Sequence, residues 1–270
     1  MPGHPPLAAV RATRGPNPDR IVAIGVIVVA WLIALVTALV QHDGPVDHHA
    51  ISGGRAVPTV GAIALFLVAW QVMTAGMMLP SSLPLVHLFV RASAGQNRPG
   101  AARAAFLAGY FAVWTWFAFM ALIGDVVLHW LANQTPWLRE RPWLIGGSVL
   151  LFAGAFQFSS LKERCLRECR MPFAFLQRHY RRGIAAAWDL GLQHGIFCLG
   201  CCWALMLTMF AVGVGSLVWM TALTGVMVIE KTMPWGRRLT PAVGALLVTW
   251  GVLVCIQPGW LPASLAFAGP

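Results

Sequence analysis

The stretch that decides the fold runs from residue 184 to residue 209 and reads IAAAWDLGLQHGIFCLGCCWALMLTM. Asp189 is its only charged residue, and most of the remainder is apolar. A helix of nearly thirty residues that begins at Ile184 is roughly 43 Å long, whereas the hydrocarbon core of a bilayer is about 30 Å thick. The sequence therefore predicts a long membrane-spanning helix, with Asp189 and Gln193 toward the cytosolic headgroups.

The same stretch concentrates side chains that bind soft metal ions. Three thiols, one imidazole and two thioethers fall within sixteen residues: His194, Cys198, Cys201, Cys202, Met206 and Met209. At about 100° per residue, all six lie within an arc of roughly 140° on one helix face. Sulfur and imidazole ligands suit Cu(I) or zinc, and not Mg²⁺ or Ca²⁺. Cysteine and methionine also serve as apolar filler in buried helices, but a histidine in the same arc favours a metal site.

The composition places the whole chain in a membrane. Hydrophobic residues make up 58% of the 270 residues and charged residues only 10%, whereas about a quarter of a soluble protein is charged. The 13 Trp residues suit aromatic belts at two interfaces. The apolar segments are too long for barrel strands, so we expect an all-α polytopic protein in contact with the lipid bilayer. The net charge of +10 lies in short loops between apolar segments, which argues against a nucleic-acid partner.

Seven apolar segments predict about seven transmembrane helices. They cover residues 21–40, 60–79, 105–123, 144–158, 184 to about 212, 217–229 and 241–256. Residues 1–20 are expected to form a disordered cytosolic tail, residues 21–256 the helical membrane domain with its motif-bearing part at 60–256, and residues 257–270 a short tail. If the N-terminus is cytosolic, sixteen of the 19 Lys and Arg residues lie inside, all but Arg55, Arg139 and Arg141. This bias predicts an N-in, C-out topology.

The second apolar segment carries a further row of possible ligands. Met73 and Met77 share one helix face with Trp70 and Ser81 because they recur at three- and four-residue spacing. Proline lacks an N–H group, so Pro80 and the proline four residues later should break or kink this helix and leave carbonyl groups that need partners. We expect the Met73/Met77 face to meet the sulfur-rich face of the long helix.

Two smaller features lie near the cytosolic surface. Cys165 and Cys169 are four residues apart in the most charged part of the chain, and together they supply half a metal site that could exchange metal with a cytosolic carrier. Glu230 is an ionisable group close to membrane depth, where such groups are functional suspects. It is expected either to balance the charge of a bound ion or to form an interfacial ion pair with Lys231.

Two other functions are compatible with these residues. The C-x-x-C spacing of Cys198 and Cys201 is also that of a dithiol, which in a membrane enzyme would exchange electrons, for example with a quinone. The βαβ context in which such motifs usually occur is missing, so a non-enzymatic role is favoured. In the other alternative, the chain is a non-catalytic subunit of a membrane complex and its Cys and Met residues serve only for packing.

Four motifs, in this order, resemble those of one bacterial family of metal-binding integral membrane proteins, a domain of unknown function sometimes labelled copper chaperone. The motifs are Trp70-x-x-Met73-x-x-x-Met77-Met78-Leu79-Pro80-Ser81, Lys162-x-x-Cys165-x-x-x-Cys169-Arg170, His194-Gly195-x-x-Cys198-x-Gly200-Cys201-Cys202-Trp203-x-x-Met206 and Glu230-Lys231. The resemblance covers roughly residues 60–256. It implies a helical multi-pass protein of the bacterial inner (plasma) membrane with a copper-related role, and it supplies no mechanism.

The sequence thus predicts a membrane protein that binds a soft metal ion, first of all Cu(I), with zinc as the second choice. The expected ligands are Cys198, Cys201, Cys202 and His194, with Met73, Met77 and Met206 as thioether partners and with Cys165, Cys169 and Glu230 in supporting roles. No more than about four of them can bind one ion. Transport, storage and delivery to a client all stay open, and a cytosolic or periplasmic carrier or client protein is the expected partner.

Overall fold

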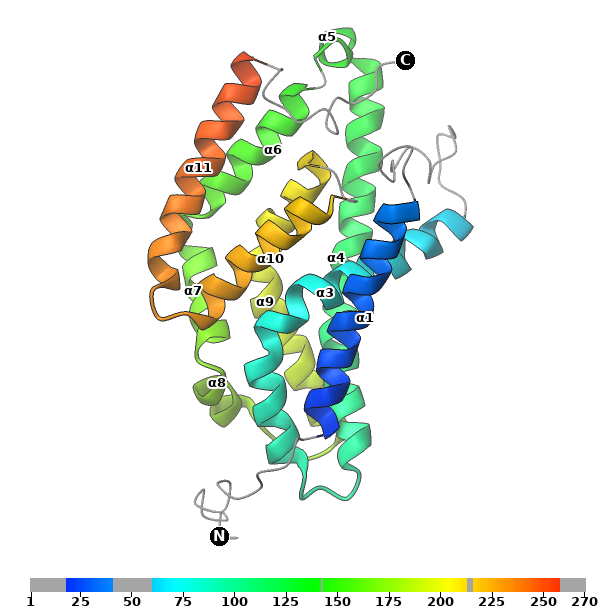
Figure 1. Cartoon of the computed structure of the whole chain (residues 1–270), viewed down its shortest axis with the longest axis vertical. Coiled ribbons are helices and arrows are strands. Elements are labelled where there is room, and N and C mark those ends of the chain that lie inside the picture. The colour runs from blue at the N-terminus through cyan, green and yellow to red at the C-terminus, as the bar shows by residue number, and fades with distance from the viewer. Residues whose placement is uncertain (1–17, 41–59, 142, 213–215, 258–270) are drawn as a thin grey trace.

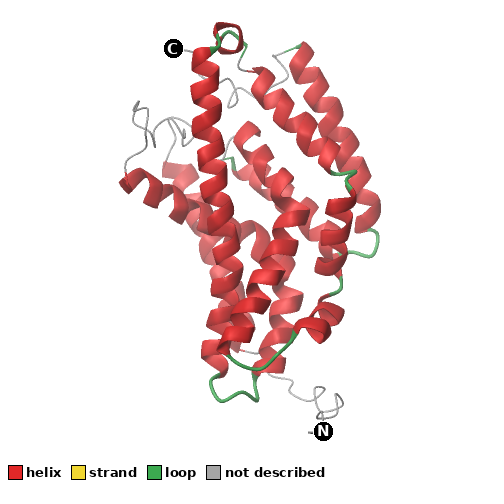
Figure 2. Cartoon of the chain, turned by 180° about the vertical axis from the view of Figure 1, so that it is seen from behind, coloured by secondary structure: helices red, strands yellow, loops and turns green. Residues whose placement is uncertain are grey.

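The computed structural model describes residues 18–40, 60–141, 143–212 and 216–257, and all regular secondary structure in these ranges is helical (Figure 2). The predicted all-α class is therefore confirmed. The helices are α1 (Pro18–Val40), α3 (Val60–Ser93), α4 (Pro99–Gln134), α5 (Pro136–Arg139), α6 (Trp143–Phe156), α7 (Ser160–Arg170), α8 (Pro172–His179), α9 (Ile184–Val212), α10 (Leu217–Thr232) and α11 (Gly236–Ile256). The predicted tails at 1–20 and 257–270 lie almost wholly outside the described residues.

Helix α9 is the centre of the bundle. It packs against α4 along much of its length and also contacts α6, α7 and α10. Helix α3 lies against α1, α4 and α10, while α11 packs on α6 at the far side (Figure 1). The sulfur-rich stretch at residues 184–209 thus belongs to α9, the helix around which the others are arranged.

Glycines allow α4 and α9 to approach until their backbones touch. A Cβ atom at Gly191 of α9 would collide with the carbonyl oxygen of Phe106 in α4, and one at Gly109 of α4 would collide with the carbonyl oxygen of Trp188 in α9. Small residues serve the same purpose in many membrane helix pairs. The close approach brings Tyr110 of α4 to the thiol of Cys198 on α9.

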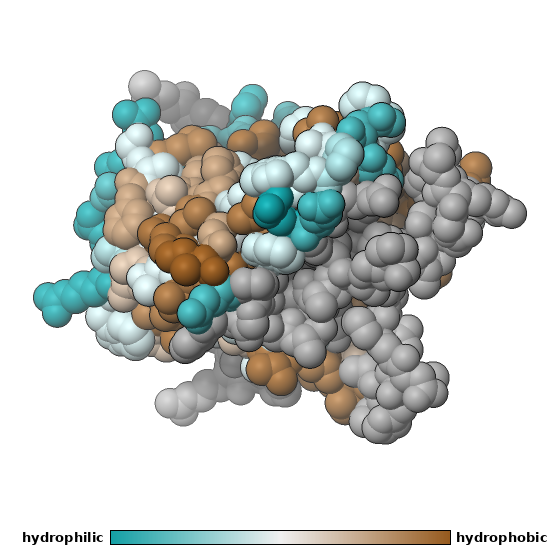
Figure 3. All heavy atoms as spheres, turned by 90° about the horizontal axis from the view of Figure 1, so that it is seen from above, coloured by the Kyte–Doolittle hydropathy of each residue, from teal (hydrophilic) through white to brown (hydrophobic). Residues whose placement is uncertain are grey.

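The distribution of side chains is that of a membrane protein. Large apolar side chains such as Leu65, Trp116 and Leu246 are exposed on the outside, whereas Lys162, Glu230 and other ionisable groups are buried inside. Seen from above, the described residues at this end of the molecule include both hydrophilic and hydrophobic side chains (Figure 3). Ionisable groups thus lie in the interior, and large apolar side chains lie on the outside of the helices.

Four helical stretches among the described residues are long and apolar enough to cross a membrane: Ile63–Ser93, Pro99–Gln134, Ile184–Met209 and Gly236–Ile256. A fifth span results if Trp143–Phe156 and Ser160–Arg170, which meet at a bend of 64°, are counted together. The predicted number of seven is not confirmed. Helix α10 has 16 residues, fewer than the about 20 that a span needs, whereas α1 has 23 residues and includes the apolar stretch Ile24–Val36.

Helix α3 continues through its two prolines to Ser93, so the predicted end of this span near Leu79 is wrong. The helix nevertheless changes direction along its course (Figure 1). Because Pro80 has no N–H group, the carbonyl of Gly76 lacks its usual donor four residues later in the helix. The indole Nε1 of Trp31, in α1, donates a hydrogen bond to this carbonyl at 3.2 Å. The structure thus supplies the partner that a freed carbonyl requires in a membrane.

The predicted end of the third apolar segment also differs from the structure. Helix α4 extends to Gln134, well beyond the predicted end at residue 123. The residues from Asp125 to Trp130, which follow the predicted apolar segment, belong to the same helix. Polar side chains on its last turns therefore end the apolar segment but not the helix.

Candidate metal site

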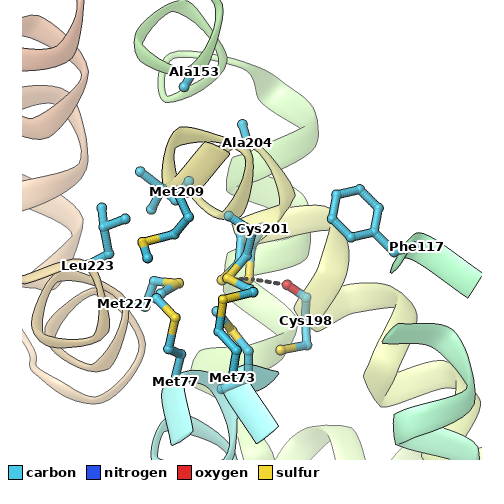
Figure 4. Packing of buried hydrophobic residues seen from close by; sticks show 14 of the residues in the cluster. Met73, Met77, Phe117, Ala153, Cys198, Cys201, Ala204, Met209, Leu223 and Met227 are labelled. Atoms are coloured by element: carbon cyan, nitrogen blue, oxygen red, sulfur yellow. Dashed lines mark hydrogen bonds between the residues drawn. The ribbon is translucent and has the colours of Figure 1, made fainter. Parts of the chain in front are cut away.

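Three thiols of α9 lie together in the core. Cys198, Cys201 and Cys202 are each at most 1% exposed. The sulfur atoms of Cys201 and Cys202 are 3.4 Å apart, and the Cys201 thiol donates a hydrogen bond to the carbonyl oxygen of Cys198 at 3.1 Å (Figure 4). The predicted helix face therefore forms a continuous buried sulfur surface.

Helix α7 brings two more thiols to this surface. Its first turn is capped by Ser159, whose hydroxyl accepts a hydrogen bond from the backbone N–H of Lys162 at 3.1 Å. Cys169, in its last turn, places its sulfur 3.9 Å from that of Cys201. Cys165 packs on Gly200, where a Cβ atom would lie 2.5 Å from the Cys165 sulfur. The two cysteine groups that the sequence placed in separate regions thus lie side by side.

These sulfur separations are close to those of ligands that share one ion. With metal–sulfur bonds of about 2.3 Å, two sulfur ligands of a tetrahedral ion lie about 3.8 Å apart. The Cys201 sulfur lies 3.4 Å from the sulfur of Cys202 and 3.9 Å from that of Cys169, on either side of this value. Across the described ranges, however, no three His, Cys, Asp or Glu side chains are grouped so that they could hold a metal ion. A complete ligand set needs methionine sulfur or a small rearrangement.

Lys231 of α10 is the cation nearest to the thiols. It is 5% exposed, and its ammonium group donates hydrogen bonds to the sulfur of Cys198 and to the hydroxyl of Ser81, both at 3.1 Å. The hydroxyl of Tyr110 lies 3.2 Å from the same sulfur. A cation and a hydroxyl at these distances stabilise negative charge on the Cys198 sulfur. Sequence reasoning gave Lys231 no such role, because its hydrogen-bond partners come from two other helices, α3 and α9.

Glu230 does not pair with its neighbour Lys231, so the expected ion pair between them is wrong. Both carboxylate oxygens of Glu230 accept hydrogen bonds from Lys162 of α7, at 2.8 Å and 3.1 Å. Lys162 also donates to Gln157, and Arg170 donates to the backbone carbonyl of Glu230 at 2.7 Å. Because consecutive residues on a helix point about 100° apart, Glu230 faces α7 while Lys231 faces the thiols.

His194 lies one helical turn from Cys198 and is buried. Its Nε2 atom lies 3.1 Å from the hydroxyl of Ser82 on α3. Its ring stacks on Tyr110, with the ring centroids 5.4 Å apart, and on Phe106, with the centroids 6.3 Å apart. The structure thus places this histidine in an aromatic and hydroxyl environment beside the thiols.

Methionines from three helices surround the thiols on the other side. Met73 and Met77 of α3, Met209 of α9 and Met227 of α10 point into the same region of the core, with Met73 beside Cys201 (Figure 4). Met206 is buried in the same core. The expected meeting of the Met73/Met77 face with α9 is confirmed. Met227 was missed, although the seven-residue spacing of Met220 and Met227 places both on one helix face.

The fold and this site define the chain as a helical protein with membrane-length apolar helices and a buried cluster of soft ligands. It belongs to the PpoB2 family, described as copper chaperone, whose model matches residues 67–254. The matched range includes all the candidate ligands and excludes α1. No curated protein and no solved structure matches the chain.

Proposed function

We propose that this protein binds Cu(I) as its cargo in the buried sulfur cluster at the centre of the bundle. The observation that carries the proposal is the convergence of thiols from α7 and α9 beside a cation, where a thiolate-bound ion is both enclosed and charge-balanced. The family's description as copper chaperone supports the same metal. The ligands are Cys198, Cys201 and Cys202, with Met73 and Met206 of the same buried core completing the set.

Copper suits these ligands better than zinc. Structural zinc sites are closed by four Cys, His or carboxylate ligands. Thiolates and thioethers select Cu(I), and here thioethers outnumber every other donor close to the thiols. A site of this composition excludes hard ions such as Mg²⁺ because it offers no carboxylate or water-rich shell.

Cys169 is the ligand through which copper enters or leaves. It is half-buried at the end of α7, whereas its neighbour Cys201 is 1% exposed. A sulfur at the surface and a buried sulfur 3.9 Å away allow transfer by ligand exchange. The partner is a carrier or client protein that presents or accepts Cu(I) at this helix.

The site lies in a multi-pass protein of the bacterial inner membrane with seven spans and a cytosolic N-terminus. The bias of positive charge supports this topology. In addition, α1 begins and α11 ends at opposite ends of the bundle, which agrees with an odd number of crossings (Figure 1). Helix α1, with 23 residues, is long enough to cross, and the shorter α10 then crosses as part of the bundle, where neighbouring helices shield its ends.

Elemental analysis of purified protein tests the proposal. Protein in detergent is loaded with Cu(I) under reducing conditions, and the bound copper per chain is measured for the wild type and for a variant with Cys198, Cys201 and Cys202 replaced by Ser. We expect the variant to lose at least one bound ion. Cys255→Ser is the matched control, because this cysteine lies in α11 against Gly147 and away from the site.

Unchanged copper content in the triple variant would contradict the thiol site. Mass spectrometry of the unloaded protein under non-reducing conditions separates the proposal from the redox alternative. Free thiols agree with metal binding, whereas a disulfide between Cys198 and Cys201 would favour a thiol–disulfide enzyme.

A further inference from the structure

Methionine is distributed very unevenly in this protein. Ten of the 11 methionines lie among the described residues. Seven of these ten are buried, and all seven belong to the core that surrounds the thiols: Met73, Met77, Met78, Met206, Met209, Met220 and Met227. Met120, Met171 and Met233, by contrast, are 42–43% exposed. Buried methionine is therefore confined to one region of the described protein.

A second buried core serves as an internal comparison. It is built from α3, α4, α8 and α9, three of which also form the thiol region, and its members are Leu85, Val86, Phe89, Val90, Ala102, Phe106, Phe175, Leu176, Ala187 and Leu190. It contains no methionine. The same helices are thus packed with Leu, Val, Phe and Ala where only packing is needed, and a need for flexible filler does not explain why methionine gathers beside the thiols.

Three of the buried methionines come from three different helices and converge. Met77 of α3, Met209 of α9 and Met227 of α10 are each 0% exposed. Their thioether groups point toward a common centre, with Met73 on the side of Cys201 (Figure 4). Three ligands contributed by three helices are fixed by the packing of the bundle rather than by one flexible loop.

The chemistry of a thioether differs from that of a thiol in its proton balance. A thiol must lose its proton before it binds a metal, so its affinity falls as the pH falls. A thioether carries no proton and no charge, and it prefers soft ions such as Cu(I). A monovalent ion with three neutral ligands also brings only a single positive charge into the apolar core.

We propose that Met77, Met209 and Met227 form a second Cu(I) site, made of thioethers alone and separate from the thiol cluster. The proposal rests on copper being the cargo, but not on the thiols being its ligands. Met73, which lies between the two sites, is placed to pass the ion from one to the other. The protein then holds copper at two positions that respond differently to pH.

The test replaces the three methionines by leucine, which has a similar volume and is tolerated in most cores. Purified Met77→Leu/Met209→Leu/Met227→Leu protein is loaded with Cu(I), and the bound ions per chain are counted. We expect one ion fewer than in the wild type. The matched control replaces Met120, Met171 and Met233 by leucine and should bind as many ions as the wild type.

The variant that lacks Cys198, Cys201 and Cys202 provides an independent measurement. It should keep one Cu(I) per chain, and acidification should not release this ion because no proton competes for thioether sulfur. X-ray absorption at the copper edge should show a shell of sulfur ligands. These measurements need no methionine variant, so they decide the question even if the leucine variant fails to fold.

The results separate this inference from the proposed thiol site. A folded leucine variant with wild-type copper content overturns the thioether site, and so does a variant without Cys198, Cys201 and Cys202 that binds no Cu(I). If that cysteine variant keeps its full copper content while the leucine variant loses an ion, the result supports the thioether site and contradicts the thiol site.

Discussion

At the scale of single residues, the site's geometry depends on the buried ion pair between Lys162 and Glu230. It ties α7 to α10, and both side chains are at most 1% exposed. Removing one partner of such a pair leaves an unpaired charge in the core, which costs about 3–5 kcal/mol. We expect Lys162→Met to lower the free energy of unfolding by about this amount, and the double variant Lys162→Met/Glu230→Leu to recover part of the loss. Chemical unfolding in detergent measures both.

The exposed pair between Arg237 and Glu163 is the control for this prediction. Its side chains are 71% and 63% exposed, and exposed pairs contribute at most about 1 kcal/mol. Arg237→Ala should therefore change the stability little. Purely additive effects of Lys162→Met and Glu230→Leu would show that the two charges are not coupled.

Single residues also show where sequence reasoning reaches its limit. The shared face of Cys198, Cys201 and Cys202 follows from helical periodicity alone, because one turn fixes which side chains are neighbours. Cys169 lies 3.9 Å from Cys201 although 32 residues separate them in the chain. No local pattern encodes that distance, since it depends on how α7 packs on α9.

At the scale of elements, the close contact of α4 and α9 is the interface most sensitive to side-chain size. In Gly191→Ala the added methyl group meets the backbone of Phe106, which cannot move aside like a side chain. Overpacking of this kind costs about 1–3 kcal/mol. We expect a lower free energy of unfolding and, because Tyr110 moves away from Cys198, faster reaction of that cysteine with a thiol reagent.

Gly124→Ala, in α4, is the control, since nothing lies within 4 Å of an added Cβ atom there. It should be neutral or gain up to about 1 kcal/mol from the better helix propensity of alanine. Equal stability of Gly191→Ala and the wild type would mean that the two helices are not in backbone contact.

Helix α3 shows how far an element can be predicted. Two prolines indicated an interruption and at least one carbonyl in need of a partner. The helix in fact continues, and Trp31 of α1 supplies the hydrogen bond to Gly76. The missing donor is a property of proline and can be read from sequence, whereas the identity of the group that replaces it depends on which helix packs alongside.

At the scale of the whole molecule, the number of membrane crossings decides whether the two ends of the chain lie on the same side of the membrane. Seven crossings with a cytosolic N-terminus place the chain after Gln134 outside and after Arg170 inside. A green fluorescent protein, which is fluorescent only in the cytosol, should therefore be dark when fused after Gln134 or after Ile256 and bright when fused after Arg170. Fluorescence from the fusion after Ile256 would indicate an even number of crossings.

The sequence by itself determined that this is an all-helical chain with membrane-length apolar segments and that its central helix has a sulfur-rich face, because hydropathy and helical periodicity are local properties. Only the tertiary structure decided what meets that face: the thiol of Cys169, the ammonium group of Lys231 and the thioethers of Met77 and Met227. These groups come from α3, α7 and α10, and their convergence depends on how close the helices lie and how each is rotated about its axis. Glycines at the contacts and the buried ion pair between Lys162 and Glu230 set both quantities through packing, and neither quantity leaves a local periodicity in the sequence.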